Sequence, residues 1–340
     1  MEPRYNDDLR RNREEARRGL EEALYEVKRV IVGQDAMLER MIVALLAGGH
    51  VLLEGVPGLA KTLTVKTLAE VLGGTFKRIQ FTPDLVPADL VGTRIYRPDS
   101  GRFDVELGPV FGNFLLADEI NRAPAKVQSA LLEVMQEQQV TIGGETFPVP
   151  RPFLVMATQN PIESEGTYPL PEAQIDRFLM KVVVDYPSTA EESQVVARSL
   201  DDFPEVRERL SLENLESYAR AVHTVIADRR EIGYAVALAD ATRNPSEYGL
   251  DDLEPYIAYG ASPRGPIGLV QAARALAMLR GRHHVAIADI RDLALDVLRH
   301  RIVLSYDGLS ESISVDDILE RVLGAVPRPE SLRDDAEAAA

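Results

Sequence analysis

Cysteine is absent from this chain of 340 residues. Without thiols the protein can form no disulfide, no thiolate metal site and no cysteine nucleophile, which fits a reducing compartment. Long apolar runs are also missing, because none reaches the roughly 18 residues that a membrane-spanning helix needs. The N-terminal segment MEPRYNDDLRRNREE has no apolar region of the kind found in signal peptides. We therefore expect a cytoplasmic protein with no membrane insertion.

Basic residues are in the minority, since 38 Lys and Arg stand against 54 Asp and Glu, which gives a net charge of −16. An acidic surface repels the phosphate backbone, so no specific nucleic-acid partner is expected. Two catalytic patterns are absent as well. H-E-x-x-H does not occur, and the segment at 308–312 lacks the last glycine of G-x-S-x-G. Neither zinc-protease nor serine-hydrolase chemistry finds support.

Short apolar runs alternate with helical stretches from residue 50 to residue 185. Each run is 4–6 residues long and rich in Val, Leu, Ile or Phe, as strands of buried parallel sheets are. Strands that alternate with helices predict right-handed crossovers, and hence an α/β fold with a five-stranded parallel sheet covered by helices on both faces. The five runs are 50–53, 77–81, 114–117, 153–158 and 181–185.

The remaining segments surround this core. Residues 1–29 mix eight basic with eight acidic side chains, which predicts a solvated helix with i,i+4 ion pairs. Two pairs of short runs, at 94–106 and 138–149, predict insertions that project from the sheet. After a break near 186–210, only helical patterns follow. We predict a charged helix at 1–29, an αβα core at 30–190, an all-α domain at 191–328 and a flexible tail at 329–340.

The segment GVPGLAKT at 55–62 follows a predicted strand and opens a predicted helix. It departs from the P-loop pattern G-x-x-x-x-G-K-[ST] at Ala60, which replaces the second glycine. In a P-loop, backbone N–H groups at a helix N-terminus surround the β-phosphate. Lys61 would then reach the β- and γ-phosphates and Thr62 would hold Mg²⁺, provided that Ala60 has helical dihedrals. The alternative is a plain glycine turn between a strand and a helix.

Polar groups follow two of the other predicted strands. Asp118 and Glu119 end the apolar run FLLA, where two carboxylates are costly unless they have a function. Ligands bind at the carboxyl ends of strands in α/β sheets, so we expect Asp118 to hold Mg²⁺ and Glu119 to polarise the attacking water. Asn160, after the run at 153–158, could orient that water from the opposite side, although Asn-Pro turns often end strands.

Several basic side chains carry a weaker signal. Arg177 and Arg264 offer positive charge that phosphoryl transfer can use, but spacing alone favours ordinary surface or capping arginines. The segment RGRHH at 280–284 forms a small basic cluster between two predicted helices. It could touch a phosphate or a nucleic acid, yet basic residues at a helix C-terminus explain it as well.

Together these motifs resemble the MoxR branch of the AAA+ ATPases. The resemblance covers about residues 25–325, and its run at 157–178 is highly specific. The P-loop with alanine before the lysine looks like this branch's own version. The matching segments are IVGQ at 31–34, EGVPGLAKT at 54–62, LLADEINRAP at 115–124, QVTIGGETFPVP at 139–150, ATQNPIESEGTYPLPEAQIDRF at 157–178 and GASPRG at 260–265.

The resemblance implies an AAA+ core followed by an α-helical lid, ATP or ADP with Mg²⁺ as ligands, and a ring of copies, usually a hexamer. It implies that Asn160 is sensor 1, that Arg177 is an arginine finger acting on the neighbouring subunit's ATP, and that Arg264 is sensor 2. Residues 31–34 would line the adenine site. The residues implied to contact the nucleotide are Ile31, Val32, Gly33, Gly55, Val56, Pro57, Gly58, Leu59, Ala60, Lys61, Thr62, Leu63, Asp118 and Arg264.

The resemblance also implies a use for the ATP. It points to chaperone-like remodelling, maturation or activation of protein partners, often ones with a von Willebrand factor A domain. A nucleic-acid motor or loader on the same scaffold is one alternative, which the acidic balance disfavours. A metal-chelatase motor subunit is another, which fits the run at 157–178 less well.

Overall fold

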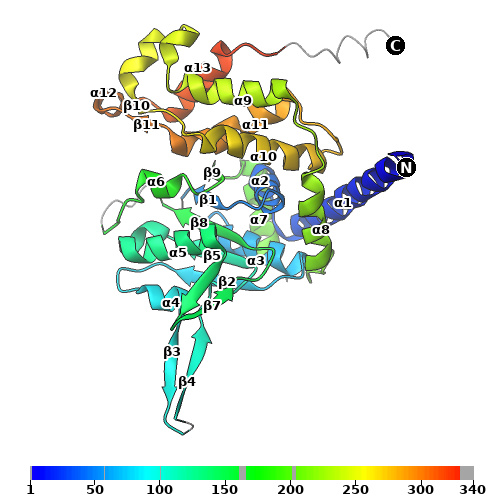
Figure 1. Cartoon of the computed structure of the whole chain (residues 1–340), viewed down its shortest axis with the longest axis vertical. Helices are drawn as coiled ribbons and strands as arrows, with labels where there is room; N and C mark the ends of the chain where they lie inside the picture. Colours follow the sequence, from blue (N-terminus) through cyan, green and yellow to red (C-terminus); the bar gives the residue numbers. More distant parts are fainter. Residues whose placement is uncertain (1, 57, 100, 161–165, 201–203, 330–340) are drawn as a thin grey trace. The chain divides into compact units, whose positions relative to one another are not determined.

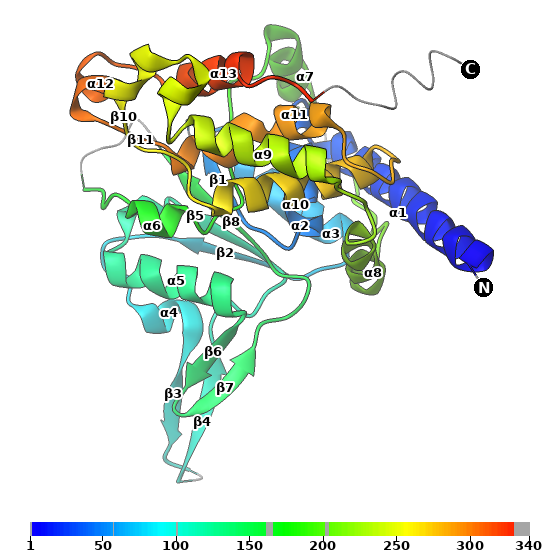
Figure 2. The same cartoon turned by 45° about the horizontal axis from the view of Figure 1, so that its top comes forward.

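The chain forms two compact units that divide between Val222 and His223. Figures 1 and 2 show the elements of each unit in two views. The sequence predicted the second domain from residue 191, but helices α7 (Thr189–Ser199) and α8 (Leu212–Val222) belong to the first unit. The division comes later because α8 packs on the N-terminal helices. The computed structural model describes residues 2–56, 58–99, 101–160, 166–200 and 204–329.

The first unit is built on a five-stranded sheet in the order β2-β5-β8-β1-β9, with every neighbouring pair parallel. This confirms the α/β fold and the five predicted strands. Register sets Glu54 opposite Gln159 and Gln80 opposite Asp118, so polar side chains end several strands at one edge of the sheet. The strands are β1 (Val51–Glu54), β2 (Phe76–Gln80), β5 (Phe114–Asp118), β8 (Leu154–Gln159) and β9 (Met180–Val183).

Helices cover this sheet on both faces (Figure 2). On one face α5 buries Leu131 and Leu132 in a core with Leu115 and Val155 of the strands. Each such side chain contributes roughly 1.5–3 kcal/mol when it leaves water. On the other face α3 packs on β2 and β5, and α2 packs on β9. The helices of this layer and of the connections are α2 (Asp35–Leu46), α3 (Lys61–Val71), α4 (Pro87–Val91), η1 (Ile120–Arg122), α5 (Ala125–Glu137) and α6 (Glu172–Ile175).

Helix α1 (Glu2–Val30) is not the purely solvated helix that its charge predicted. Small and apolar residues at i, i+4, i+7 and i+11 form a fully buried stripe that packs on α3 and α8. The predicted i,i+4 pairing does occur between Arg17 and Glu21, at 3.2 Å. Glu26 is buried and accepts hydrogen bonds from Arg209, which lower its pKa. The stripe consists of Ala16, Leu20, Ala23 and Val27.

Two antiparallel hairpins project from the sheet, as the sequence predicted (Figure 1). The first joins β3 (Gly92–Arg97) to β4 (Arg102–Leu107), and the second joins β6 (Gln139–Ile142) to β7 (Glu145–Pro148). A hydrogen bond from Arg94 to the carbonyl of Gly143, at 3.3 Å, links them.

The second unit consists mainly of helices, which bears out the predicted lid domain. It departs from an all-α fold in one antiparallel pair, β10 (Ile257–Tyr259) with β11 (Val303–Leu304). Among the described residues, no helix has the length and apolarity needed to cross a membrane. The helices are α9 (Arg229–Ala241), η2 (Pro245–Tyr248), η3 (Asp251–Tyr256), α10 (Arg264–Leu279), α11 (Ile287–Leu298), η4 (Arg299–Arg301), α12 (Tyr306–Ser310) and α13 (Val315–Ala325).

His50 is a buried histidine of the first unit, and it gives stability a dependence on pH. Its Nε2 donates to the carbonyl of Met135 at 3.2 Å, and its Nδ1 accepts from the N–H of Val155 at 3.1 Å. Burial lowers the pKa of His50 to about 4, from 6.5. Between pH 6.5 and pH 4, His50 is therefore protonated in the unfolded chain but neutral in the folded chain. The free energy of unfolding falls as the pH drops through this range.

We expect protonation of His50 to lower the free energy of unfolding by about 2 kcal/mol when the pH falls from 7 to 5. Urea unfolding of the wild type and of His50→Gln at both pH values measures it. The wild type should lose about 2 kcal/mol more than the variant over that interval. Parallel losses in the two proteins would mean that His50 does not control this pH dependence.

Candidate functional site

The segment 55–62 forms a glycine-rich turn between β1 and α3, as predicted. Gly55 is close to the end of β9, because a Cβ at this position would lie 2.5 Å from the carbonyl oxygen of Val184. Gly58 has a backbone φ of +90°, which residues other than glycine rarely adopt. Pro57 lies outside the described residues. The turn therefore needs glycine at two positions, for two different physical reasons.

Ala60 precedes α3 and has left-handed helical dihedrals, φ 53 and ψ 19. Ala60 therefore does not have the right-handed helical dihedrals of α3, on which the sequence prediction was conditional. A Cβ in this region costs about 1–2 kcal/mol, which explains why the general P-loop pattern has glycine here. The Thr64 hydroxyl donates to the Ala60 carbonyl at 3.0 Å, a contact between Ala60 and the first turn of α3.

We expect Ala60→Gly to raise the free energy of unfolding by about 1 kcal/mol, because glycine accepts a positive φ without strain. Ala130→Gly in α5 is the control. Glycine there should lower stability by about 1 kcal/mol, since that residue is in a right-handed helix. Chemical denaturation of the two variants checks the signs. A lower free energy of unfolding in both variants would show that the backbone at Ala60 is not strained.

Lys61 lies at the first position of α3, and its Nζ donates to the carbonyl of Gly55 within the turn. Partial burial lowers the pKa of Lys61, whereas Asp118, Glu54 and Glu119 act to raise it. The lysine is therefore within electrostatic reach of the carboxylates that end β1 and β5. Glu54 in turn pairs with Lys181 of β9 at 2.7 Å.

Asp118 is the last residue of β5, and both of its carboxylate oxygens accept hydrogen bonds. Thr158 of β8 donates to Oδ1 at 2.6 Å, and Arg78 of β2 donates to Oδ2 at 2.7 Å. The Asp118 charge acts on Lys61, at the helix start that also carries Thr62. Proteins bind Mg²⁺ through one or two carboxylates together with phosphates and water. The predicted ligand pair of Asp118 and Thr62 fits that donor set.

Glu119 turns away from the strand with φ 55, in the left-handed region. Its N–H donates to the hydroxyl of Thr158 at 2.8 Å. Its carboxylate accepts from Nε2 of Gln80 at 2.8 Å and pairs with Arg122 at 3.1 Å. Glu119 and Asp118 thus share one hydrogen-bond network at the carboxyl edge of the sheet.

Asn160 follows the next strand of the sheet, β8, and is buried with 9% of its surface exposed. Since β8 pairs with β5, the structure brings the chain around Asn160 to the same edge as Asp118. Of the other predicted nucleotide contacts, Leu59 is buried in the turn. Val56, Thr62 and Leu63 are partly exposed.

The segment 31–34 connects α1 to α2 and reaches the chain just after β9. Ile31 is buried, and Gly33 has φ +67. A Cβ on Gly33 would lie 2.8 Å from the carboxylate of Glu191. Gln34 donates to the carbonyl of Asp185 at 3.2 Å. The P-loop residue Gly55 lies against the carbonyl of Val184, and the predicted adenine segment contacts the next residue, Asp185.

The two predicted arginines lie apart from this network in the chain. Arg177 follows α6, and its Nη1 donates to the carbonyl of Leu132 in α5 at 3.0 Å. Its Nε is buried and has no hydrogen-bond partner within the described part of the chain. Arg264 begins α10 in the second unit, and its backbone N–H donates to the Ser262 hydroxyl. The roles assigned to these arginines stay predictions.

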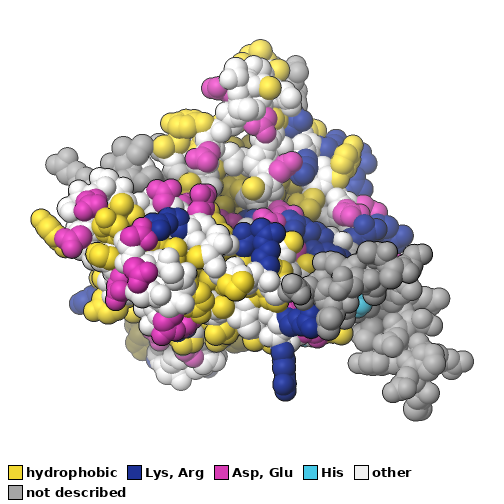
Figure 3. Space-filling model, turned by 90° about the horizontal axis from the view of Figure 1, so that it is seen from above, with side chains coloured by type: hydrophobic (Ala, Val, Ile, Leu, Met, Phe, Trp, Pro, Cys, Tyr) yellow, Lys and Arg dark blue, Asp and Glu magenta, His cyan; other side chains and the backbone are white. Residues whose placement is uncertain are grey.

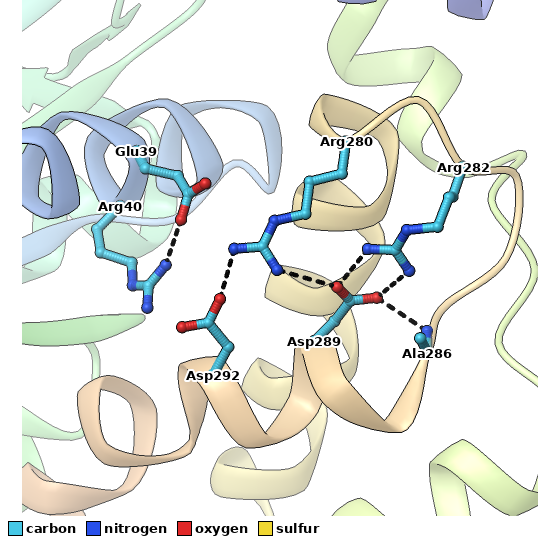
Figure 4. Close-up of polar contacts among 7 residues, drawn as sticks. All are labelled: Glu39, Arg40, Arg280, Arg282, Ala286, Asp289 and Asp292. Carbon is cyan, nitrogen blue, oxygen red and sulfur yellow. Dashed lines mark hydrogen bonds and ion pairs between the residues drawn. The ribbon is translucent and has the colours of Figure 1, made fainter.

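The basic segment at 280–284 is neutralised within the second unit, as Figure 4 shows. Asp289 is fully buried and accepts from Arg282 at 2.6 Å, from Arg280 at 3.4 Å and from the N–H of Ala286 at 2.8 Å. Asp292 also pairs with Arg280. Arg280 lies at the C-terminal end of α10, as in the alternative that the sequence allowed, and both arginines also tie this turn to the start of α11 through ion pairs.

Four network members escaped the sequence analysis: Arg78, Gln80, Arg122 and Thr158. Each is a polar side chain near the end of a strand, and that position was the available signal. Thr158 in particular is buried near the end of β8, directly after the apolar residues 154–157. The strand order, which places β2 and β8 on either side of β5, could not be predicted from the sequence.

Comparisons with known proteins agree with this geometry. Residues 50–180 match the ATPase family associated with various cellular activities (AAA), and residues 252–322 match the AAA lid domain. Chaperone MoxR1 of Mycobacterium tuberculosis is 57% identical over 92% of this chain and 82% of its own length. Protein MoxR of Methylorubrum extorquens is 33% identical over 89% of this chain and 93% of its own.

A solved structure is similar throughout its length. The crystal structure of a candidate ATPase from Cytophaga hutchinsonii superposes with a TM-score of 0.91 at 47% identity. The match covers 96% of this chain and 99% of that one. With its P-loop turn, paired strand-end carboxylates and helical second unit, this chain belongs to the MoxR family of AAA+ ATPases.

Proposed function

We propose that this protein binds ATP with Mg²⁺ and hydrolyses it to ADP and phosphate. The observation that carries the proposal is the grouping of a glycine turn, Lys61 and the Asp118–Glu119 pair at one edge of the sheet. The carboxylates lie close enough to Lys61 to oppose the fall of its pKa. A cation and two acids around a helix N-terminus are the parts that phosphoryl transfer from a nucleotide requires.

In this proposal, the backbone N–H groups of the turn and Lys61 hold the phosphates. Thr62 and Asp118 hold Mg²⁺, which when bound neutralises charge on the β- and γ-oxygens. Glu119 accepts the proton of the attacking water, and Asn160 orients that water from the neighbouring strand.

The remaining parts of the proposal concern the assembly. Residues 31–34 contact the adenine, and Arg264 contacts the bound nucleotide. Copies of the chain form a ring, a hexamer by family resemblance, in which Arg177 of one subunit stabilises the transition state on the ATP of the next. The guanidinium suits this role because its planar fork matches phosphate oxygens.

We propose that hydrolysis drives chaperone-like remodelling of protein partners that carry a von Willebrand factor A domain. Support comes from the high identity with a relative named as a chaperone. A nucleic-acid motor is the rival, and the charge of −16 argues against it. On the face drawn in Figure 3, Lys and Arg side chains are interspersed with Asp and Glu. The second rival is a motor subunit of a metal chelatase.

Partner capture tests the proposal. A Glu119→Gln chain with ATP and Mg²⁺ should retain proteins with a von Willebrand factor A domain from a cell lysate, and the wild type without ATP should not. Enrichment of DNA, with a salt-dependent mobility shift, would favour the nucleic-acid motor. Enrichment of a chelatase subunit would favour the second rival.

A further inference from the structure

Thr158 lies where the two site acids meet. It belongs to β8, the strand beside β5, and Ala157 is in register with Ala117. Only 3% of its surface is exposed. A buried hydroxyl in an apolar strand is costly unless it is hydrogen-bonded, so its partners show what it does.

The hydroxyl of Thr158 binds both acids at once. It donates its single proton to Oδ1 of Asp118 at 2.6 Å. Its lone pairs accept the backbone N–H of Glu119 at 2.8 Å. Since a hydroxyl has one proton, the acceptor of that proton is the carboxylate and the donor to the oxygen is the amide. One atom thereby fixes the side chain of Asp118 and the backbone of Glu119.

The second bond matters because Glu119 is not in strand geometry. In a continued strand, the side chains at 118 and 119 would point to opposite faces of the sheet. The left-handed dihedrals of Glu119 break that alternation. The turn lets the Glu119 carboxylate accept from Gln80, whose own amide oxygen accepts from the Arg78 that also holds Asp118. Without the hydroxyl, the Glu119 N–H that stabilises this turn loses its partner.

We propose that Thr158 is a positioning residue that sets Asp118 and Glu119 jointly for metal holding and water activation. The inference rests on the proposed ATPase function. Loss of the hydroxyl leaves the P-loop and Lys61 in place, so nucleotide binding survives, whereas both acids lose their fixed orientation. Small displacements of positioned groups cost about 100-fold in rate.

The test compares Thr158→Val, which keeps the shape without the hydroxyl, with Thr158→Ser, which keeps the hydroxyl. We expect the Val variant to lose about 10- to 100-fold in kcat and to need several-fold more Mg²⁺ for half-maximal rate. Its affinity for a fluorescent ATP analogue should stay within about 3-fold of wild type. The Ser variant should recover most of the rate. Thr158→Ala replaces the Val variant if the latter does not fold.

Thr75→Val is the matched control. The Thr75 hydroxyl donates to the side-chain oxygen of Asn113 at 2.9 Å and accepts its backbone N–H at 3.0 Å. Thr75 thus also donates one hydrogen bond and accepts another, at the opposite end of β5, but both bonds go to one residue and Thr75 is exposed. The kcat of the Thr75→Val variant should equal that of the wild type. Equal kcat in the Val and Ser variants of Thr158, or a loss that Thr75→Val reproduces, would overturn the proposal.

Hydrogen exchange separates this inference from the proposed function. The amide of Glu119 should be protected in wild type and in Thr158→Ser, and should exchange at least 10-fold faster in Thr158→Val. If the wild type releases no phosphate from ATP, the ATPase proposal fails, while exchange at Glu119 still decides whether Thr158 holds the turn. Unchanged exchange in the Val variant would contradict the positioning role.

Discussion

Glu119→Gln should reduce ATP hydrolysis by about 10²- to 10⁴-fold while ATP binding stays nearly intact. The glutamine keeps the size of the side chain and an oxygen that can accept from Gln80, but it cannot take a proton from water. In the proposed site, ATP is bound by the backbone of the turn and by Lys61, which the substitution does not change. Phosphate release and titration with a fluorescent ATP analogue measure the two effects.

The control for this prediction is Glu70→Gln, which removes one carboxylate from the exposed side of α3, where it pairs with Lys66. That variant should hydrolyse ATP at the wild-type rate. If Glu119→Gln retained more than about a tenth of the wild-type rate, the general-base role would be wrong. If it lost ATP binding as well, the carboxylate would be holding the ligand and not activating water.

Arg177→Ala should lower hydrolysis by about 10³- to 10⁵-fold, the range found for arginine fingers, again with ATP binding retained. The side chain also donates to the carbonyl of Leu132, so the stability of the variant has to be measured alongside. Arg220→Ala in α8 is the control, because that arginine is exposed and pairs only weakly with Glu216, at 3.6 Å.

Mixing decides whether Arg177 acts on a neighbouring subunit. Arg177→Ala subunits keep Glu119, and Glu119→Gln subunits keep Arg177. In a mixed ring, an intact acid on one subunit meets an intact arginine from the next, so the mixture should regain activity that neither variant has alone. No recovery would place Arg177 on the ATP of its own subunit, and equal loss of binding and hydrolysis would make it a structural residue.

The strands β1, β5 and β8 could be predicted because buried parallel strands have an apolar composition that can be recognised without any knowledge of their neighbours. The P-loop and Asp118–Glu119 followed from short patterns at strand ends. The supporting network could not be predicted in the same way. Thr158 and Gln80 are about 40 residues away from the acids that they bind, on either side in sequence. Only the strand order makes them neighbours.

Three further differences have local causes. Charge dominated the prediction for α1, but the stripe of Ala16, Leu20, Ala23 and Val27 is fully buried in the part of the helix whose side chains the structure describes. The strands β10 and β11 contain three and two residues, too few for any alternation to be visible. The later division between the units reflects the packing of α8 on α1 and α2, which no composition shift marks.

The backbone between Val184 and Asp185 has a consequence for ligand selection. The carbonyl of Val184 closes over Gly55, and the carbonyl of Asp185 accepts from Gln34. Two consecutive residues thereby fix the span between the phosphate loop and the segment proposed to contact the base. In the proposed nucleotide site, this fixed span would favour ligands whose base and phosphates are held at one set separation.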